Sequence, residues 1–283
     1  MNMNLKWIIE EFDGDENAQK IADAVRNLGH DAQVVKYAIY QELDKLSSHN
    51  NNICVGTITF ARNIERSSWN PGIICNFKNF DCMSYYGYFG KYLSNNDYLF
   101  FPLGEVERRL EAIKAMLGCN FLFIRPSNGL KTFGGHVIYD YKDLEYLTKK
   151  YPVHLPVVVS SKKSLIAEYR VFIHKDKILT GSKYKNGSNV EYKQMIEENK
   201  IYGLHDEEAT QQKEVYNFVD TVLKETKFRP DPIFAMDIGI HPIIGPKLLE
   251  LSSFSTSGWY ESDINKLVAA GSDCAIEAIQ EVM

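Results

Sequence analysis

Two acidic residues, Asp237 and Glu250, stand thirteen positions apart in the last third of the chain, each inside an apolar run. The runs 234–240 and 247–251 predict two strands, and the glycines and prolines between them predict a chain reversal. A carboxylate inside an apolar strand is costly unless something pairs with it, and oxygen ligands are those that Mg²⁺ prefers. The pattern therefore indicates a shared magnesium site, with two solvent-facing acids on an alternating hairpin as the alternative.

A glycine-rich segment, FIRPSNGLKTFGGHVI, is a second candidate for chemistry. A predicted strand delivers Arg125, and the loop after it contains Lys131, Gly134 and Gly135. Glycines let the backbone approach a ligand closely and expose N–H groups to phosphate oxygens. The segment is not the Walker pattern, since no GxxxxGK precedes a helix. It indicates a phosphate-binding loop, with an ordinary hairpin that exposes basic residues as the alternative.

A third candidate is the segment AEYRVFIHKDKILTGSKYK. Glu168 and Arg170 lie two positions apart on a predicted strand and therefore point to the same face. The following strand returns along the first, and Lys183 is expected on the side of Arg170. A same-face Glu/Arg pair is also typical of a structural salt bridge. Together with the two cations of the glycine-rich segment, however, these residues suit a nucleoside triphosphate bridged by magnesium.

The elements that must position these residues divide into two blocks. The first block reads as strand, helix, strand, strand, which predicts a small α/β unit with a parallel sheet, over residues 6–11, 18–28, 31–37 and 53–60. The second block predicts strands at 121–125, 136–139, 156–160, 166–174 and 177–184, and helices at 103–117, 143–150, 207–224 and 263–282. We place the domain boundary between residues 104 and 105, giving domains 1–104 and 105–283.

Composition excludes several classes of protein. With 283 residues, 45% hydrophobic and 24% charged, the chain is typical of a globular protein with a sizeable core. A net charge of −5 gives no general basic field for nucleic acid, and no apolar run is long enough for a membrane span. The N-terminal segment meets acidic residues too early for a signal peptide. Five scattered cysteines without a CxxC pair argue against disulfides and a zinc cluster, and predict a cytoplasmic location.

The three candidate segments occur in a recognisable order. The pieces FIRPSNGLKTFGG, EYRVFI, TGSKYK, AMDIGI and LLELSSFSTSGWY together resemble the ATP-grasp superfamily. Specifically, they resemble its Arg-plus-two-Lys clade, which is found widely in bacterial and phage genomes. The resemblance covers residues 105–283. It implies an ATP-grasp fold of mixed α+β and α/β class, in which two α+β subdomains grip ATP, preceded by a small α/β pre-ATP-grasp domain over residues 1–104.

The resemblance implies ATP as the cofactor and assigns eight residues to it: Arg125, Lys131, Gly134, Gly135, Val159, Ser160, Ser161 and Glu168. Arg125 stands where a strand residue touches the α- and β-phosphates. Lys131 lies in the loop that covers the triphosphate. The run 157–161 corresponds to the hinge whose backbone pairs with adenine, and Glu168 is placed to bind the ribose hydroxyls.

The resemblance also implies the catalytic and metal-binding residues. Arg170 and Lys183 correspond to the cations that stabilise the transferred phosphoryl group. Asp237 and Glu250 correspond to ligands of Mg²⁺, and Ser252 stands in the place of the usual third ligand, an asparagine. A serine hydroxyl is a weaker metal ligand than an asparagine carbonyl.

The implied activity is that of an ATP- and magnesium-dependent carboxylate–amine ligase that forms an amide bond through an acyl phosphate. Its expected substrates are small-molecule or peptide carboxylates and amines, with a protein terminus as a further candidate. Ser252 supports a second hypothesis, an ATP-binding regulatory or decoy protein with little ligase activity. A kinase-like phosphotransferase is a third, because some ATP-grasp relatives are kinases.

Overall fold

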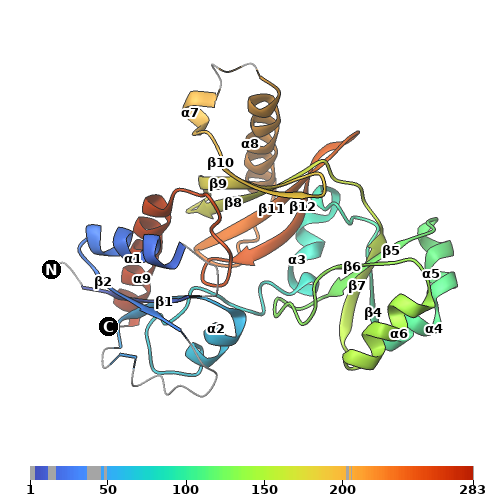
Figure 1. The fold of residues 1–283 in the computed structure, drawn as a ribbon, viewed down its shortest axis with the longest axis horizontal. Coiled ribbons are helices and arrows are strands. Elements are labelled where there is room, and N and C mark those ends of the chain that lie inside the picture. The colour runs from blue at the N-terminus through green and yellow to red at the C-terminus, as the bar shows by residue number, and fades with distance from the viewer. Residues whose placement is uncertain are drawn as a thin grey trace.

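The computed structural model describes residues 4–11, 17–36, 46–47, 50–201, 204 and 206–282. Three separate sheets organise these residues, and each sheet has helices packed against it (Figure 1). The N-terminal sheet lies beside the C-terminal helix, and a four-stranded sheet lies at the opposite end of the molecule. A five-stranded sheet lies between them, so that two interfaces between sheets are available for binding sites.

The N-terminal sheet is parallel, with strand order β2-β1-β3. Its elements are β1 (Lys6–Glu10), α1 (Asn17–Asn27), β2 (Asp31–Val35), β3 (Asn52–Val55) and α2 (Ile58–Ile64). The predicted strand 53–60 is wrong in its second half, because residues 58–60 form the first turn of α2 instead. The side chain of Thr57 accepts a hydrogen bond from the backbone N–H of Phe60 and caps this helix. Local capping therefore outweighs the β-branched composition of the segment.

The four-stranded sheet is antiparallel and has the strand order β4-β7-β5-β6. Its strands are β4 (Leu99–Pro102), β5 (Leu122–Pro126), β6 (His136–Ile138) and β7 (Pro156–Ser161). Its helices are α4 (Leu103–Arg108), α5 (Leu110–Leu117) and α6 (Tyr141–Lys150). The predicted helix 103–117 is thus two helices, interrupted at Arg109 (φ −119°, ψ 18°). Strand β4 precedes the boundary we placed at residue 104 and nevertheless belongs to this sheet.

The five-stranded sheet is antiparallel, with the order β10-β9-β8-β11-β12. Its elements are β8 (Ala167–His174), β9 (Lys177–Asn186), β10 (Asn189–Gln194), α7 (Glu198–Ile201), α8 (Glu207–Glu225), β11 (Ile233–His241) and β12 (Gly245–Ser253). Strand β10 is absent from the sequence prediction, since its polar residues give no apolar alternation. The predicted reversal between 240 and 247 is confirmed as the turn from β11 to β12.

Alternation along β8 decides which core each side chain joins. Val171 and Ile173 pack in the core under α8, whereas Phe172 packs in the core shared with α9 (Ile264–Val282). Helix α9 also packs on α1, and its core includes Trp7 of β1. One helix therefore covers parts of both the N-terminal sheet and the five-stranded sheet, as the neighbouring red and blue helices of Figure 1 show.

The aromatic segment before β4 forms α3 (Cys82–Phe89) and a short 3-10 helix, η2 (Gly90–Tyr92). Tyr85 and Tyr86 are fully buried, and their rings meet edge to face with centroids 5.1 Å apart. They belong to the core that joins the five-stranded sheet to Val158 of β7. The aromatic cluster thus packs two sheets together. Within the described part of the chain, no helix combines the length and the apolar character needed to cross a lipid bilayer.

Asp231, just before β11, gives a prediction for stability. Burial raises the pKa of Asp231 to about 7, although the backbone N–H of Asn76 donates to its carboxylate at 3.1 and 3.3 Å and opposes the shift. The folded chain then keeps a proton that the unfolded chain loses above a pKa of 3.8. The free energy of unfolding therefore falls as the pH rises from 3.8 to about 7. We expect Asp231→Asn to raise Tm more at pH 8 than at pH 5, by about 5 °C. Thermal unfolding at both pH values checks this, with the exposed Asp23→Asn as control, and an equal shift at both would contradict it.

Candidate nucleotide-binding site

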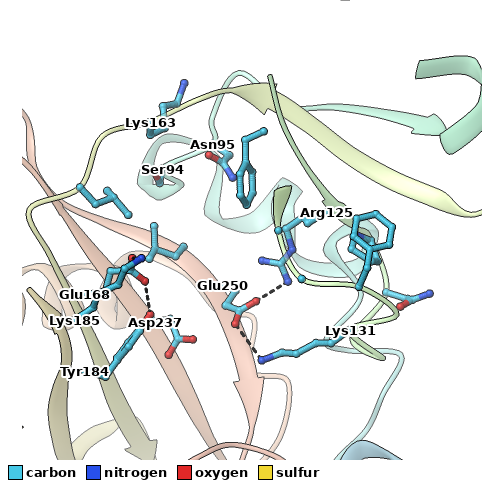
Figure 2. Close-up of a pocket in the computed structure, with 18 residues that line it drawn as sticks. Ser94, Asn95, Arg125, Lys131, Lys163, Glu168, Tyr184, Lys185, Asp237 and Glu250 are labelled. Carbon is cyan, nitrogen blue, oxygen red and sulfur yellow. Dashed lines mark hydrogen bonds and ion pairs between the residues drawn. The ribbon is translucent and has the colours of Figure 1, made fainter. Parts of the chain in front are cut away.

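A cavity of about 420 Å³ lies between the four-stranded and five-stranded sheets (Figure 2). Its size falls within the usual range for small-molecule sites. The lining comes from the segment before β4, β5 and the loop after it, the segment after β7, and strands β8, β9, β11 and β12. The polar side chains that line it are Ser94, Asn95, Arg125, Asn128, Lys131, Lys163, Glu168, Tyr184, Lys185, Asp237 and Glu250.

Glu250 forms ion pairs with both cations of the glycine-rich segment. Arg125 Nη2 lies 2.6 Å from one carboxylate oxygen, and Lys131 Nζ lies 3.2 Å from the other (Figure 2). Burial works to raise the pKa of Glu250, but the charges of Arg125, Lys131 and Arg170 outweigh it and hold the pKa well below its usual range. The carboxylate is therefore ionised at neutral pH and available to a cation.

Asp237 and Arg170 form a buried ion pair beside this group. Arg170 Nε and Nη2 each donate to one oxygen of Asp237 at 2.7 Å, and the two side chains are 5% and 2% exposed. Burial raises the pKa of Asp237, and the bidentate pairing with Arg170 opposes that shift. A buried pair of this geometry also fixes the orientation of both groups.

The strand register explains why residues far apart in sequence meet here. Asp237 on β11 pairs with Arg170 on β8 and with Glu250 on β12. The three side chains therefore form a row across three neighbouring strands. A β-bulge between Asp237 and Ile238 interrupts the ladder at this row, as is common next to functional sites.

Glu168 lines the same cavity, where two neighbours on β9 hold it. Tyr184 Oη donates to one carboxylate oxygen at 2.8 Å, and Lys185 Nζ donates to the other at 2.7 Å. Glu168 therefore shares the cavity with Arg125, Lys131 and the acidic pair, as the sequence order predicted.

Lys183 differs from expectation. The register pairs Lys183 with Tyr169 and Ser182 with Arg170, so Lys183 lies on the opposite face of the sheet from Arg170. An irregularity between Glu168 and Tyr169 shifts the register and brings Lys185 to the cavity instead. The expectation that Lys183 shares the face of Arg170 is therefore wrong, and Lys185 was missed. Both lysines stand in the motif SKYK, but the sequence pattern does not reveal the bulge that chooses between them.

The expected hinge residues Val159, Ser160 and Ser161 do not line the cavity. They lie in β7, which is paired on both sides, with Val159 opposite both Leu99 and Ile124. Ser161 instead donates from its backbone N–H and its hydroxyl to Asp97 at 3.2 and 2.5 Å. Lys163 and Leu165, just beyond the strand, line the cavity in their place. The sequence does not indicate this shift, because the pairing of β7 with β4 joins segments that are more than fifty residues apart.

Gly134 and Gly135 also line the cavity. A Cβ at Gly135 would overlap the ring of Phe123, whereas a Cβ at Gly134 would have no heavy atom within 4 Å. Gly135 is therefore required for the close approach of the loop to β5, and Gly134 is not.

Ser252 lies beside Glu250 and lines a small adjoining space that Arg125 and Lys131 also reach. Its hydroxyl donates to Glu250 Oε1 at 3.4 Å. Among the residues that the structure describes, no group of three or more His, Cys, Asp or Glu could hold a metal ion. Two carboxylates with a neighbouring hydroxyl nevertheless fit Mg²⁺, which binds one or two carboxylates and completes its coordination with ligand phosphates and water.

Three stacked tyrosines, which no sequence pattern indicated, lie beside the site, and one of them, Tyr184, lines the cavity. Tyr260 lies between Tyr184 and Tyr192, with ring centroids 5.1 Å apart on each side. The guanidinium carbon of Arg170 lies 4.9 Å from the centre of the Tyr260 ring, within cation–π range. Tyr260 has φ +51°, a rare conformation for a tyrosine, so its stacked position is held against local backbone preference.

A comparison with protein families decides the identity of this fold. The model of an ATP-grasp domain family, the second family of the Arg-plus-two-Lys clade, matches residues 106–270, which is more than half of the chain. The chain belongs to the Arg-plus-two-Lys clade of ATP-grasp proteins. No curated protein sequence matches this ATP-grasp chain.

Several solved structures have a similar fold. D-alanine–D-alanine ligase from Bacillus anthracis matches with a TM-score of 0.59 at 14% identity, covering 99% of this chain and 100% of the ligase. D-cycloserine synthetase DcsG matches with a TM-score of 0.59 at 10% identity, covering 95% and 99% of the two chains. The ATP-grasp ligase PsnB, in complex with a minimal precursor, matches with a TM-score of 0.55 at 14% identity, covering 96% and 99%. The predicted family and the predicted ATP-grasp fold are thus confirmed.

Proposed function

We propose that this ATP-grasp chain is an ATP- and Mg²⁺-dependent carboxylate–amine ligase. The observation that carries the proposal is the row of Arg170, Asp237 and Glu250 across three strands. Asp237 and Glu250 of this row line one cavity together with Arg125 and Lys131, and both cations pair with Glu250. Cations and metal-binding acids in one cleft are what a transferring phosphoryl group needs. The ligase fold of the structural neighbours is consistent with this chemistry.

In the proposed complex, Arg125 and Lys131 bind the phosphates of ATP, and Glu168 binds the ribose. Lys163 and Leu165, rather than Val159 to Ser161, would flank the adenine, because they line the cavity. Asp237 and Glu250 would hold Mg²⁺, with Ser252 beside them. The ion would supply neutralisation of phosphate charge. Arg125 and Lys131 would then exchange Glu250 for phosphate oxygens.

The proposed reaction has two steps. An oxygen of the substrate carboxylate attacks the γ-phosphorus of ATP, the bond to the β-phosphate oxygen breaks, and ADP leaves with that electron pair. The amine then attacks the acyl carbon, the bond to phosphate breaks, and the nitrogen loses a proton. Arg170 and Lys185 are the cations we assign to the developing charge, with Lys185 in place of Lys183. Catalysis would rest on positioning and electrostatics, without a nucleophilic side chain.

The substrates we propose are small-molecule or peptide carboxylates and amines. Two neighbours favour these two classes, since one is a D-alanine–D-alanine ligase and another was solved with a precursor peptide. The deciding experiment incubates the chain with ATP, MgCl₂ and pairs of carboxylates and amines, and measures ADP and product mass. Formation of ADP with a product that is one water lighter than the two substrates supports ligation.

Two alternatives make different predictions in the same experiment. Ser252 in place of asparagine favours a regulatory or decoy protein, which would bind ATP and magnesium in calorimetry without releasing ADP across the panel. A phosphotransferase would release ADP and give a product that carries phosphate and no new amide.

Gly135 provides a test of where the nucleotide lies. In Gly135→Ala the added methyl group would overlap the ring of Phe123, which lines the cavity, and we expect this overpacking to weaken ATP binding roughly tenfold. Gly134→Ala, with open space around its added methyl group, is the matched control and should bind ATP as the wild type does. Calorimetric titration of ATP in the presence of magnesium measures both. Equal affinities for the two variants would place the nucleotide elsewhere.

A further inference from the structure

A second cavity, of about 520 Å³, lies between the N-terminal sheet and the loop that follows β12. Ile9 and Glu10 at the end of β1 and Val55 to Thr57 after β3 form one side of it. In the strand order β2-β1-β3, the chain places β2 on one side of β1 and β3 on the other. Strands β1 and β3 are parallel, and the carboxyl ends of both lie at this cavity. In open parallel sheets this is the position where ligands bind.

Glu10 is a carboxylate held in a fixed position at this cavity. It is only 8% exposed, and the backbone N–H of Thr57 donates to its Oε2 at 2.6 Å. A Cβ at Gly56 would lie 2.6 Å from both Cβ and Oε2 of Glu10, so only glycine there lets the side chain lie against β3. A carboxylate with so little exposure to solvent would be stabilised by a cationic group bound next to it.

The charges around the cavity favour a ligand that carries a cationic group. Glu10 and Glu261 contribute two negative charges, and the exposed Lys20 contributes one positive charge. The remaining lining is aromatic or neutral, including Tyr192, Trp259 and Tyr260. The cavity therefore suits a ligand with a positive group and disfavours one that is only anionic.

The second cavity shares a wall with the first. Tyr184 lines the nucleotide cavity, Tyr192 and Tyr260 line the second cavity, and the three rings are stacked. Arg170 lies on Tyr260 and donates from Nη1 to the carbonyl oxygen of Gly258, which also lines the second cavity. A ligand in the second cavity thus lies next to the end of the site where Arg170 and Asp237 are expected to meet the γ-phosphate.

We propose that the second cavity binds the substrate through a primary ammonium group, with the carboxylate of Glu10 as its partner. This inference rests on the proposed ligase function, because only a ligase would use the ligand of the second cavity as a substrate. The binding itself depends only on the cavity and on Glu10, and it can be measured without nucleotide.

The test uses the full chain and two probes that separate the functional groups. Alaninamide carries an ammonium group without a carboxylate, and N-acetylalanine carries a carboxylate without an ammonium group. We expect saturable binding of alaninamide in ligand-observed NMR, and at least about tenfold weaker binding to Glu10→Gln, because a hydrogen bond to a charged group is lost. Glu11→Gln, outside the cavity, is the matched control and should bind as the wild type does.

Several results would overturn the proposal. Absence of alaninamide binding, equal binding to wild type and Glu10→Gln, or stronger binding of N-acetylalanine would each do so. Glu261→Gln tests the other carboxylate, and a loss confined to that variant would exclude Glu10 as the partner. Thermal unfolding of each variant verifies that it folds. If alaninamide binding depends on Glu10 while no ADP forms with any substrate pair, the ligase proposal fails and the ammonium site stands.

Discussion

Glu250→Gln is expected to reduce ADP formation by at least about a hundredfold, the loss typical of removing one electrostatic group from a phosphoryl-transfer site. Glu250 is held by Arg125 and Lys131 at 2.6 and 3.2 Å and lies beside Asp237 across the β11–β12 pair. Glutamine keeps the size of the side chain and removes the negative charge that would hold Mg²⁺. ADP release with saturating ATP, magnesium and an active substrate pair measures the effect.

The pH dependence gives this prediction a second readout. Because the pKa of Glu250 is well below its usual range, its charge persists at pH values where an ordinary glutamate is half protonated. The stabilisation that the Glu250 carboxylate provides is present above the unfolded pKa and is lost only as the pH falls through the lower folded pKa.

Glu277→Gln is the matched control for Glu250→Gln, since Glu277 forms an exposed pair with Lys175 at 2.6 Å. Turnover by Glu250→Gln at the level of Glu277→Gln would contradict the proposed site.

Asp237→Asn is expected to lower Tm by about 10 °C, because it leaves the charge of Arg170 buried without a counter-charge. The two side chains are 5% and 2% exposed and are joined by two hydrogen bonds of 2.7 Å. Breaking a buried pair from one side costs about 3–5 kcal/mol, far more than a surface pair contributes. Thermal unfolding measures the loss, and ADP formation should fall with it.

A surface pair of the same residue types provides the comparison. Asp176→Asn removes the carboxylate that pairs with Arg229, in a pair whose aspartate is 68% exposed, and should change Tm by less than about 2 °C. The double variant Arg170→Met/Asp237→Asn should recover part of the stability, since neither charge is then left unpaired. A drop for Asp237→Asn no larger than that for Asp176→Asn would show that the ion pair is not a structural element of the site.

The sequence indicated those residues of the candidate site for which residue type and periodicity agree. Asp237 and Glu250 were recognisable because charged residues interrupt apolar strands, and the order of the motifs identified the Arg-plus-two-Lys clade. Lys185 was not recognisable, because a β-bulge moves it to the cavity and turns Lys183 away. The segment after β7 that lines the cavity was missed for a related reason, since the pairing of β4 with β7 depends on a strand more than fifty residues earlier.

Tyr260 could not have been placed from sequence at all. Its position depends on a positive φ and on two other tyrosines from β9 and β10. Helix α2 was missed although its cause is local, because the capping contact at Thr57 outweighs the β-branched composition of the segment. Sequence patterns therefore miss elements that distant partners or bulges determine, and also those in which a local contact opposes the composition.

The packing of α9 on α1 determines the order in which the chain can fold. Trp7, Ile9 and Ala18 bury their side chains in one core with Leu267 and Ala275, more than 240 residues later. Contacts of such sequence separation close late and slow the folding of the whole chain. The first hundred residues therefore cannot complete their own core when they are synthesised, and their apolar face stays exposed until residues 264–282 are made. A fragment that ends before residue 264 should aggregate rather than form an independent domain.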